Sequence, residues 1–205
     1  MNAQTYFFPT PIFRAYDIRG SVALLTPHVI CAIAHGLAQQ FKNAQQKQVV
    51  IGYDARLSSP YYAALMQDIL VQYGLEVTLI GCCSSPLMYY IARDFGGNGI
   101  MITASHNPKT DNGVKWILKG EPPCPDRIQQ VAQVAMKRYM PLPKLKNNTF
   151  THHIEEKFCL QYQHALLADI QLQRPFKVVI DGLYGSAGRC ASFILKKLGC
   201  EVITL

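Results

Sequence analysis

The chain contains 205 residues, of which 49% are hydrophobic and 16% are charged, and its formal net charge is +7. This composition excludes an intrinsically disordered chain and supplies enough apolar residues for a packed core. No apolar run reaches the length that crosses a bilayer, and the first residues lack the basic and apolar regions of a secretory signal. We therefore expect no membrane partner.

The basic residues and the cysteines are both spread along the chain. Composition leaves three interpretations of the charge open: an ordinary basic surface, a nucleic-acid surface, or a site for a small anionic ligand such as a sugar phosphate. A nucleic-acid surface needs clustered Lys and Arg with interleaved aromatic residues, and only short basic groups occur, so we expect no nucleic-acid partner. No CxxC pair or Cys/His group has zinc spacing, which favours a reduced, cytoplasmic protein.

Helices and strands are predicted to alternate along residues 26–139. Thr26-Pro27 is a good helix start, with a hydroxyl cap before a proline, and apolar residues then recur every four positions from Val29 to Phe41. Ser59-Pro60 and Ser85-Pro86 repeat this cap signature, and Gly74 is expected to end the second helix. The expected strands are residues 47–53, 75–80, 98–103 and 114–118. The expected helices begin at 26, 59, 85 and 125, and the last of them is expected to end at Tyr139.

The composition changes after residue 139. Residues 140–149 contain prolines, lysines and asparagines and are predicted to be a linker. A helix over 154–169, a strand over 176–181, a helix over 187–198 and a strand from 201 follow. One unit of this size cannot cover both faces of its own sheet, so we expect an incomplete second α/β domain. The predicted domains are residues 1–145 and 146–205, the first an α/β domain with helices on both faces of its sheet.

The segment Thr103-Ala104-Ser105-His106-Asn107-Pro108 follows a predicted buried strand directly. Ser105 is expected at the carboxyl end of that strand, where open α/β sheets bind ligands. A serine there can carry phosphate if cations offset the charge, and His106 and Lys115 are close in sequence. The alternative is an ordinary polar connection between a strand and a loop.

Two further segments combine charged residues with glycine. Residues 13–20 read FRAYDIRG, and their arginines suit phosphate oxygens, although a surface salt-bridge cluster would explain them equally. Residues 52–60 read GYDARLSSP, between a strand end and a helix start that favours anions. The alternative there is simple capping by Ser59, with Asp54 and Arg56 paired to each other.

Together, FRAYDIRG, GYDARLSSP and ITASHNPKTDNGVKW, in this order, resemble the alpha-D-phosphohexomutase family, above all its bacterial phosphomannomutase/phosphoglucomutase branch. The TASHNP loop is the most specific of these motifs, and Asn112-Gly113-Val114-Lys115 strengthens it. The resemblance continues through residues 153–162 and 176–188, so it covers nearly the whole chain. It implies a mixed sheet sandwiched by helices.

The resemblance implies a phosphoryl transfer between O1 and O6 of a hexose phosphate, with a hexose 1,6-bisphosphate as activator. Ser105 matches the phosphoserine that donates the phosphoryl group and holds Mg²⁺ through a phosphate oxygen. Tyr16 and Arg19 match residues that line the substrate site, and Arg56 matches a basic residue near the phosphoserine. His106 and Lys115 match residues near the reacting hydroxyl, with Lys115 or Arg19 as the general acid or base.

The family's Asp-Gly-Asp-x-Asp-Arg magnesium loop is absent from this sequence. We therefore expect this portion of a mutase to be inactive alone. We also expect the unfinished second domain to expose apolar edge residues and to favour self-association, with Val178, Ile180, Val202 and Ile203 as the candidates. A non-catalytic binding or regulatory module derived from the family is the alternative. A nucleotide-binding protein is disfavoured, because neither GxGxxG nor GxxxxGK[ST] follows a strand.

Overall fold

The computed structural model describes residues 8–138 and 154–205. Its first part contains a five-stranded sheet in the order β1-β5-β4-β2-β3. The strands are β1 (Ile18–Ser21), β2 (Gln48–Tyr53), β3 (Glu76–Cys82), β4 (Gly99–Ile102) and β5 (Asp111–Ile117). β2 runs parallel to β3 and β4, whereas β5 is antiparallel to β4 and β1. The expected mixed sheet is therefore confirmed.

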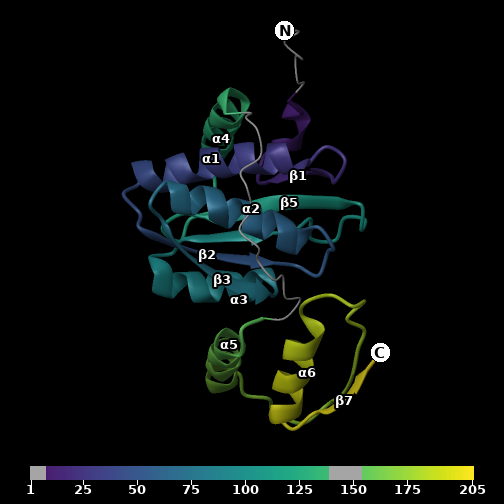
Figure 1. Cartoon of the computed structure of the whole chain (residues 1–205). Coiled ribbons are helices and arrows are strands. Elements are labelled where there is room, and N and C mark those ends of the chain that lie inside the picture. Colours follow the sequence, from purple (N-terminus) through teal and green to yellow (C-terminus); the bar gives the residue numbers. More distant parts are fainter. Residues whose placement is uncertain (1–7, 139–153) are drawn as a thin grey trace.

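Helices cover both faces of this sheet (Figure 1). α1 (Pro27–Asn43), α2 (Ser59–Gln72) and α4 (Pro125–Lys137) pack on one face, where Phe41, Leu65 and Trp116 are buried in one apolar cluster. α3 (Ser85–Ala92) packs on the other face in a second cluster, followed by the short helix η2 (Arg93–Phe95). Among the described residues, no helix is both long and apolar enough to cross a bilayer.

The helix starts follow the proline signals, with a correction of one residue at two of them. Thr26 caps α1 as expected, because its Oγ1 accepts a hydrogen bond from the Val29 amide at 3.4 Å. The predicted caps Ser59 and Ser85 are instead the first helical residues, and Ser58 and Ser84 occupy the cap positions. Ser59 is unavailable as a cap because its hydroxyl is buried and donates to Asp54.

Two elements were not predicted from the sequence. The short helix η1 (Thr10–Ile12) and strand β1 precede α1, and Ile18 is the only large apolar residue in β1. β5 begins at Asp111 instead of Val114, because polar residues at its start pair with β1. Apolar periodicity carries little signal in β1 and at the polar start of β5, where only pairing between distant segments defines the strand.

The second part of the chain comprises α5 (Glu156–Asp169), β6 (Lys177–Ile180), α6 (Gly188–Lys197) and β7 (Glu201–Thr204). β6 and β7 form a two-stranded parallel sheet. This part docks beneath α3 (Figure 1), where Phe158 is buried and the Glu155 amide donates to the Ile80 carbonyl at 3.1 Å. The predicted linker, the boundary at 145/146 and the end of the fourth helix at Tyr139 lie outside the described residues.

The β6–β7 sheet has one open apolar face. Side chains alternate along a strand, and Val178, Ile180 and Val202, which were expected to be exposed, are half-buried. Val179 and Ile203 point the other way and are 59% and 41% exposed. Of the apolar edge residues expected from the sequence, only Ile203 is therefore exposed, and Val179 joins it.

Candidate functional site

Strand register brings Arg19 and Lys115 to the same face of the sheet. Arg19 on β1 pairs with Gly113 on β5, and Lys115 lies two residues farther along β5. Asp17, directly before β1, contacts both cations: its Oδ2 lies 2.6 Å from Arg19 Nη2 and 3.6 Å from Lys115 Nζ. Because only 7% of Asp17 is exposed, this carboxylate fixes the two cations relative to each other.

Ser105 lies in the loop that leaves β4, and it is exposed. Its backbone has φ of 57°, a conformation that residues other than glycine adopt rarely. The Ser105 amide donates to Thr103 Oγ1 at 2.8 Å, and the Ser105 Oγ lies 3.1 Å from His106 Nδ1. Arg19 Nη1 donates to Asn107 Oδ1 at 2.8 Å, so the first motif reaches the serine loop.

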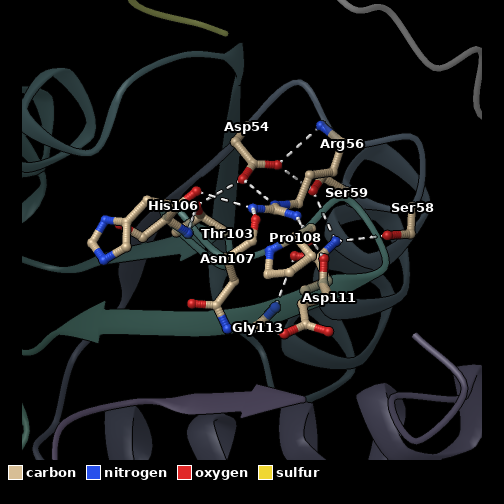
Figure 2. A network of polar contacts seen from close by, with 12 residues as sticks. Asp54, Arg56, Ser58, Ser59, Thr103, His106, Asn107, Pro108, Asp111 and Gly113 are labelled. Atoms are coloured by element: carbon tan, nitrogen blue, oxygen red, sulfur yellow. Dashed lines mark hydrogen bonds and ion pairs between the residues drawn. The ribbon is translucent and has the colours of Figure 1, made fainter. Parts of the chain in front are cut away.

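Arg56, from the loop after β2, lies at the centre of the serine loop's hydrogen bonds (Figure 2). Its Nη1 donates to the carbonyls of Pro108 at 2.5 Å and Asp111 at 2.9 Å. Its Nη2 donates to the carbonyls of Ser105 at 3.0 Å and Asn107 at 2.7 Å. Its Nε donates to Asp54 Oδ2 at 3.0 Å. A guanidinium has five N–H donors, and all five are used here.

Asp54 connects this arginine to the rest of the site. It accepts hydrogen bonds from the Arg56 amide and side chain, from Ser59 Oγ at 2.7 Å and from Thr103 Oγ1 at 2.7 Å. Asp54 and Arg56 therefore form the ion pair that the alternative interpretation of GYDARLSSP predicted. A contact between Arg56 and substrate stays a prediction, since its donors are occupied by the protein itself.

The structure connects some of the sequence-predicted site residues to the Ser105 loop more closely than others. Ser105, His106 and Arg19 are joined through the serine loop, and Lys115 joins them through Asp17. Tyr16 is 81% exposed, open to solvent beside this group. Sequence reasoning missed Asp17, Asn107 and Thr103 as members of the site. These three residues could have been found from the sequence, because each lies inside one of the motifs that contain the predicted site residues.

Tyr89 on α3 is a further neighbour of the site that the sequence did not indicate. Burial and the negative charge of Asp17 raise the pKa of Tyr89, so its phenol stays protonated at neutral pH. The phenol is therefore a hydrogen-bond donor close to the Asp17 cluster.

The carboxylates around Ser105 do not form a metal site by themselves. Among residues 8–138 and 154–205, no group of three or more His, Cys, Asp or Glu side chains is placed to hold a metal ion. Asp17 faces two cations, Asp54 faces Arg56, and Asp111 Oδ2 accepts from Asn107. Mg²⁺ prefers six oxygen ligands, of which a phosphate on Ser105 would supply one, so these residues alone do not fit the ion.

A cavity of about 620 Å³ lies between the first part of the chain and the start of α6. Four cysteines line it, Cys82, Cys83, Cys159 and Cys190, together with Leu57 and Arg189. Burial raises the pKa of all four thiols, so they are protonated and weakly nucleophilic at neutral pH. Ser105, Arg19 and Lys115 do not line this cavity.

The fold and the site define an α/β protein that presents an exposed serine beside arginine, histidine and lysine. The family described as "Phosphoglucomutase/phosphomannomutase, alpha/beta/alpha domain I" matches residues 10–141. This match covers more than half of the chain, and the chain therefore belongs to the phosphoglucomutase/phosphomannomutase family.

Similar proteins carry related names. A phosphomannomutase/phosphoglucomutase from Pseudomonas putida is 35% identical over an alignment of 204 residues, which covers 96% of this chain and 42% of the relative. A phosphoglucomutase from Neisseria meningitidis is 33% identical, over 95% of this chain and 42% of the relative. A probable phosphoglucosamine mutase from Methanothermobacter thermautotrophicus is 33% identical, over 77% of this chain and 35% of the relative. The chain thus spans less than half the length of these curated relatives.

Solved structures agree with this fold. A phosphoglucomutase/phosphomannomutase family protein from Burkholderia thailandensis superposes with a TM-score of 0.83 and 28% identity, over 97% of this chain and 44% of that protein. The expected fold of the first domain is confirmed by this similarity and by the family match.

Proposed function

We propose that this chain is the phosphoryl-carrying part of a phosphohexomutase, with Ser105 as the residue that accepts and donates the phosphoryl group. The observation that carries the proposal is the exposed Ser105 hydroxyl on a loop that Arg19 and Arg56 hold from two other segments. An exposed serine on a fixed loop can meet a phosphorylated sugar without rearrangement of the protein. The relatives' names support a hexose phosphate as the substrate.

In the proposed phosphoryl transfer, one oxygen–phosphorus bond breaks, another forms, and a proton moves on each side. A sugar hydroxyl attacks the phosphorus of phosphoserine, the bond from phosphorus to Ser105 Oγ breaks, and a new bond to the sugar oxygen forms. The sugar hydroxyl loses its proton to a base, and the Ser105 oxygen gains one. Lys115 or Arg19 is the proposed acid–base group, and His106 Nδ1, at 3.1 Å from the Ser105 Oγ, is placed to share the proton.

Charge around Ser105 suits a phosphate. Phosphorylation adds about −1.5 to −2 charge at neutral pH. Arg19 and Lys115 carry two positive charges beside Asp17, so this cluster keeps one net positive charge toward the loop. Mg²⁺, when bound to the phosphoserine, would offset the charge that remains on the transferring group. Tyr16, open to solvent beside this cluster, is the proposed contact to the sugar.

A fusion protein tests this proposal. Residues 1–205 would be joined to the part of the Pseudomonas putida relative that this chain does not match, and mannose and glucose 1-phosphate would be assayed for conversion to the 6-phosphates. We expect turnover that Ser105→Ala lowers by at least about a thousandfold, because the variant has no nucleophile. An equally folded fusion without turnover would favour the non-catalytic module instead.

The 205-residue chain alone serves as the second arm of this experiment. We expect its turnover to be lower by many orders of magnitude, because positioning a substrate is worth roughly 7–11 kcal/mol of the barrier in favourable cases. Turnover near that of the fusion would contradict the expected need for further domains.

A further inference from the structure

All five N–H donors of the Arg56 side chain form hydrogen bonds within the protein. Four of its five donors go to backbone carbonyls between Ser105 and Asp111, which are 49 to 55 residues away in sequence. The fifth goes to Asp54, whose other oxygen accepts from the Arg56 amide itself. The side chain is only 12% exposed, so water does not compete strongly for these donors.

The carbonyls that Arg56 binds belong to a loop that backbone preference would not hold in place. Ser105 has φ of 57°, and a non-glycine residue in this region costs on the order of 1–3 kcal/mol. Such a conformation persists only where the surroundings determine it. Arg56 binds the Ser105 carbonyl directly, and Thr103, which accepts from the Ser105 amide, donates to Asp54. Both sides of the strained residue are thus tied to the Asp54–Arg56 pair.

We infer that Arg56 is a positioning residue, which clamps the Ser105 loop in its strained form and does not bind the phosphate of the substrate. The role of this clamp in phosphoryl transfer rests on the proposed function, but the clamp itself does not. Lysine cannot replace Arg56, because a single ammonium has three donors and cannot reach four carbonyls that are spread around a planar fork. The positive charges that meet a phosphate on Ser105 then come from Arg19 and Lys115.

Amide hydrogen exchange measured by NMR on the full chain tests the clamp. The variants are Arg56→Lys and Arg56→Ala, and the matched controls are Arg174→Lys and Arg174→Ala, at an exposed arginine of the second part. The reporters are the amides of Ser105, Asn107 and Asp111, which are hydrogen-bonded within the loop. The amides of Ile100 and Ile102 in β4 report on the sheet.

We expect exchange at the three loop amides to rise by at least about tenfold in both Arg56 variants, because several charge-assisted hydrogen bonds are lost. Exchange in β4 and in the Arg174 variants should change by less than about twofold, since the sheet keeps its own hydrogen bonds. Added guanidinium ion, below denaturing concentration, should restore protection in Arg56→Ala by filling the vacated site. Arg56→Lys carries the test if Arg56→Ala does not fold.

Loop amides that stay protected in Arg56→Lys would overturn the clamp. A second readout is the rate at which Ser105 gains phosphate from a hexose 1,6-bisphosphate with Mg²⁺ in the fusion protein described above, measured by mass spectrometry, because the described residues of this chain alone do not fit the ion. If Arg56→Lys slows this rate without loosening the loop, Arg56 binds the ligand and the inference is wrong. If wild-type Ser105 gains no phosphate while the loop loosens as expected, the clamp stands and the proposed function fails.

Discussion

Asp17 shows how a residue without obvious chemistry organises this site. Its carboxylate contacts Arg19 and Lys115, whose side chains are only 14% and 31% exposed. Within the part of the chain that the structure describes, neither cation forms an ion pair with a second carboxylate, so Asp17 sets the position of both. Two cations held beside one carboxylate keep a net positive charge that faces the Ser105 loop.

Replacing Asp17 tests this arrangement. Asp17→Asn leaves two partly buried cations without their counter-charge, so we expect the free energy of unfolding to fall by about 2 kcal/mol. The matched control is Asp126→Asn in the first turn of α4, an exposed position where the loss should stay within about 1 kcal/mol. Urea denaturation at pH 7 measures both. Equal losses in the two variants would show that Asp17 does not hold the cations.

Elements differ in how far the sequence predicted them. α1 was predicted closely because Thr26-Pro27 defines its start and its apolar stripe has helical spacing. β1 was missed because its four residues include one large apolar side chain, and its pairing with β5 depends on a segment about 90 residues away. Local pattern does not encode such pairing.

The candidate site shows the same limit. Ser105, His106 and Arg19 could be named because their motifs resemble a known family. The contacts of Arg56 could not be predicted, because they join its side chain to backbone carbonyls of a distant loop. Nothing in the order of residues distinguishes an arginine that binds a ligand from one that binds the protein.

His35 on α1, which contacts Tyr73 at the end of α2, predicts a pH dependence of the free energy of unfolding. Burial, and secondarily the charge of Arg138, lower the pKa of His35 below its ordinary value of 6.5, and His35 Nδ1 lies 3.1 Å from the Tyr73 hydroxyl. The unfolded chain therefore binds the proton more readily than the folded one, and stability is lost as pH falls below about 6.5. This loss stops once the pH is below the folded-state pKa.

His35→Gln isolates this contribution, because glutamine keeps a polar group near Tyr73 and does not titrate. Unfolding free energies from urea denaturation between pH 5 and 8 should fall less steeply with acidification in the variant than in the wild type. Identical slopes in the two proteins would show that His35 does not couple stability to pH.

At the scale of the whole molecule, the chain pairs a well-covered domain with a small unit that leaves apolar surface open. It spans 42% of the Pseudomonas putida relative, and its β6–β7 sheet exposes Val179 and Ile203 on one face. Phe176, directly before β6, is 44% exposed as well. Both strands also have an unpaired edge within the described residues, because each pairs only with the other.

This open face leads us to expect self-association with a second copy of the chain. Burial of Val179 and Ile203 between two copies would remove apolar surface from water. Sedimentation velocity over a hundredfold concentration range should show a rise in mean mass. Val179→Thr combined with Ile203→Thr keeps the branched shape that suits a strand and should lower the association. Equal association by both proteins, or a monomer throughout, would contradict this expectation.

Site-resolved mass spectrometry tests most directly the proposal that Ser105 carries the phosphoryl group. The chain would be incubated with glucose 1,6-bisphosphate and Mg²⁺, digested, and mapped, with Ser105→Ala treated in parallel. We predict phosphate on Ser105 and none on the serines of the neighbouring loop, Ser58 and Ser59, because only Ser105 is exposed and adjacent to Arg19 through Asn107. Phosphate on Ser58 or Ser59 with Ser105 unmodified, or equal labelling of Ser105→Ala, would contradict the claim.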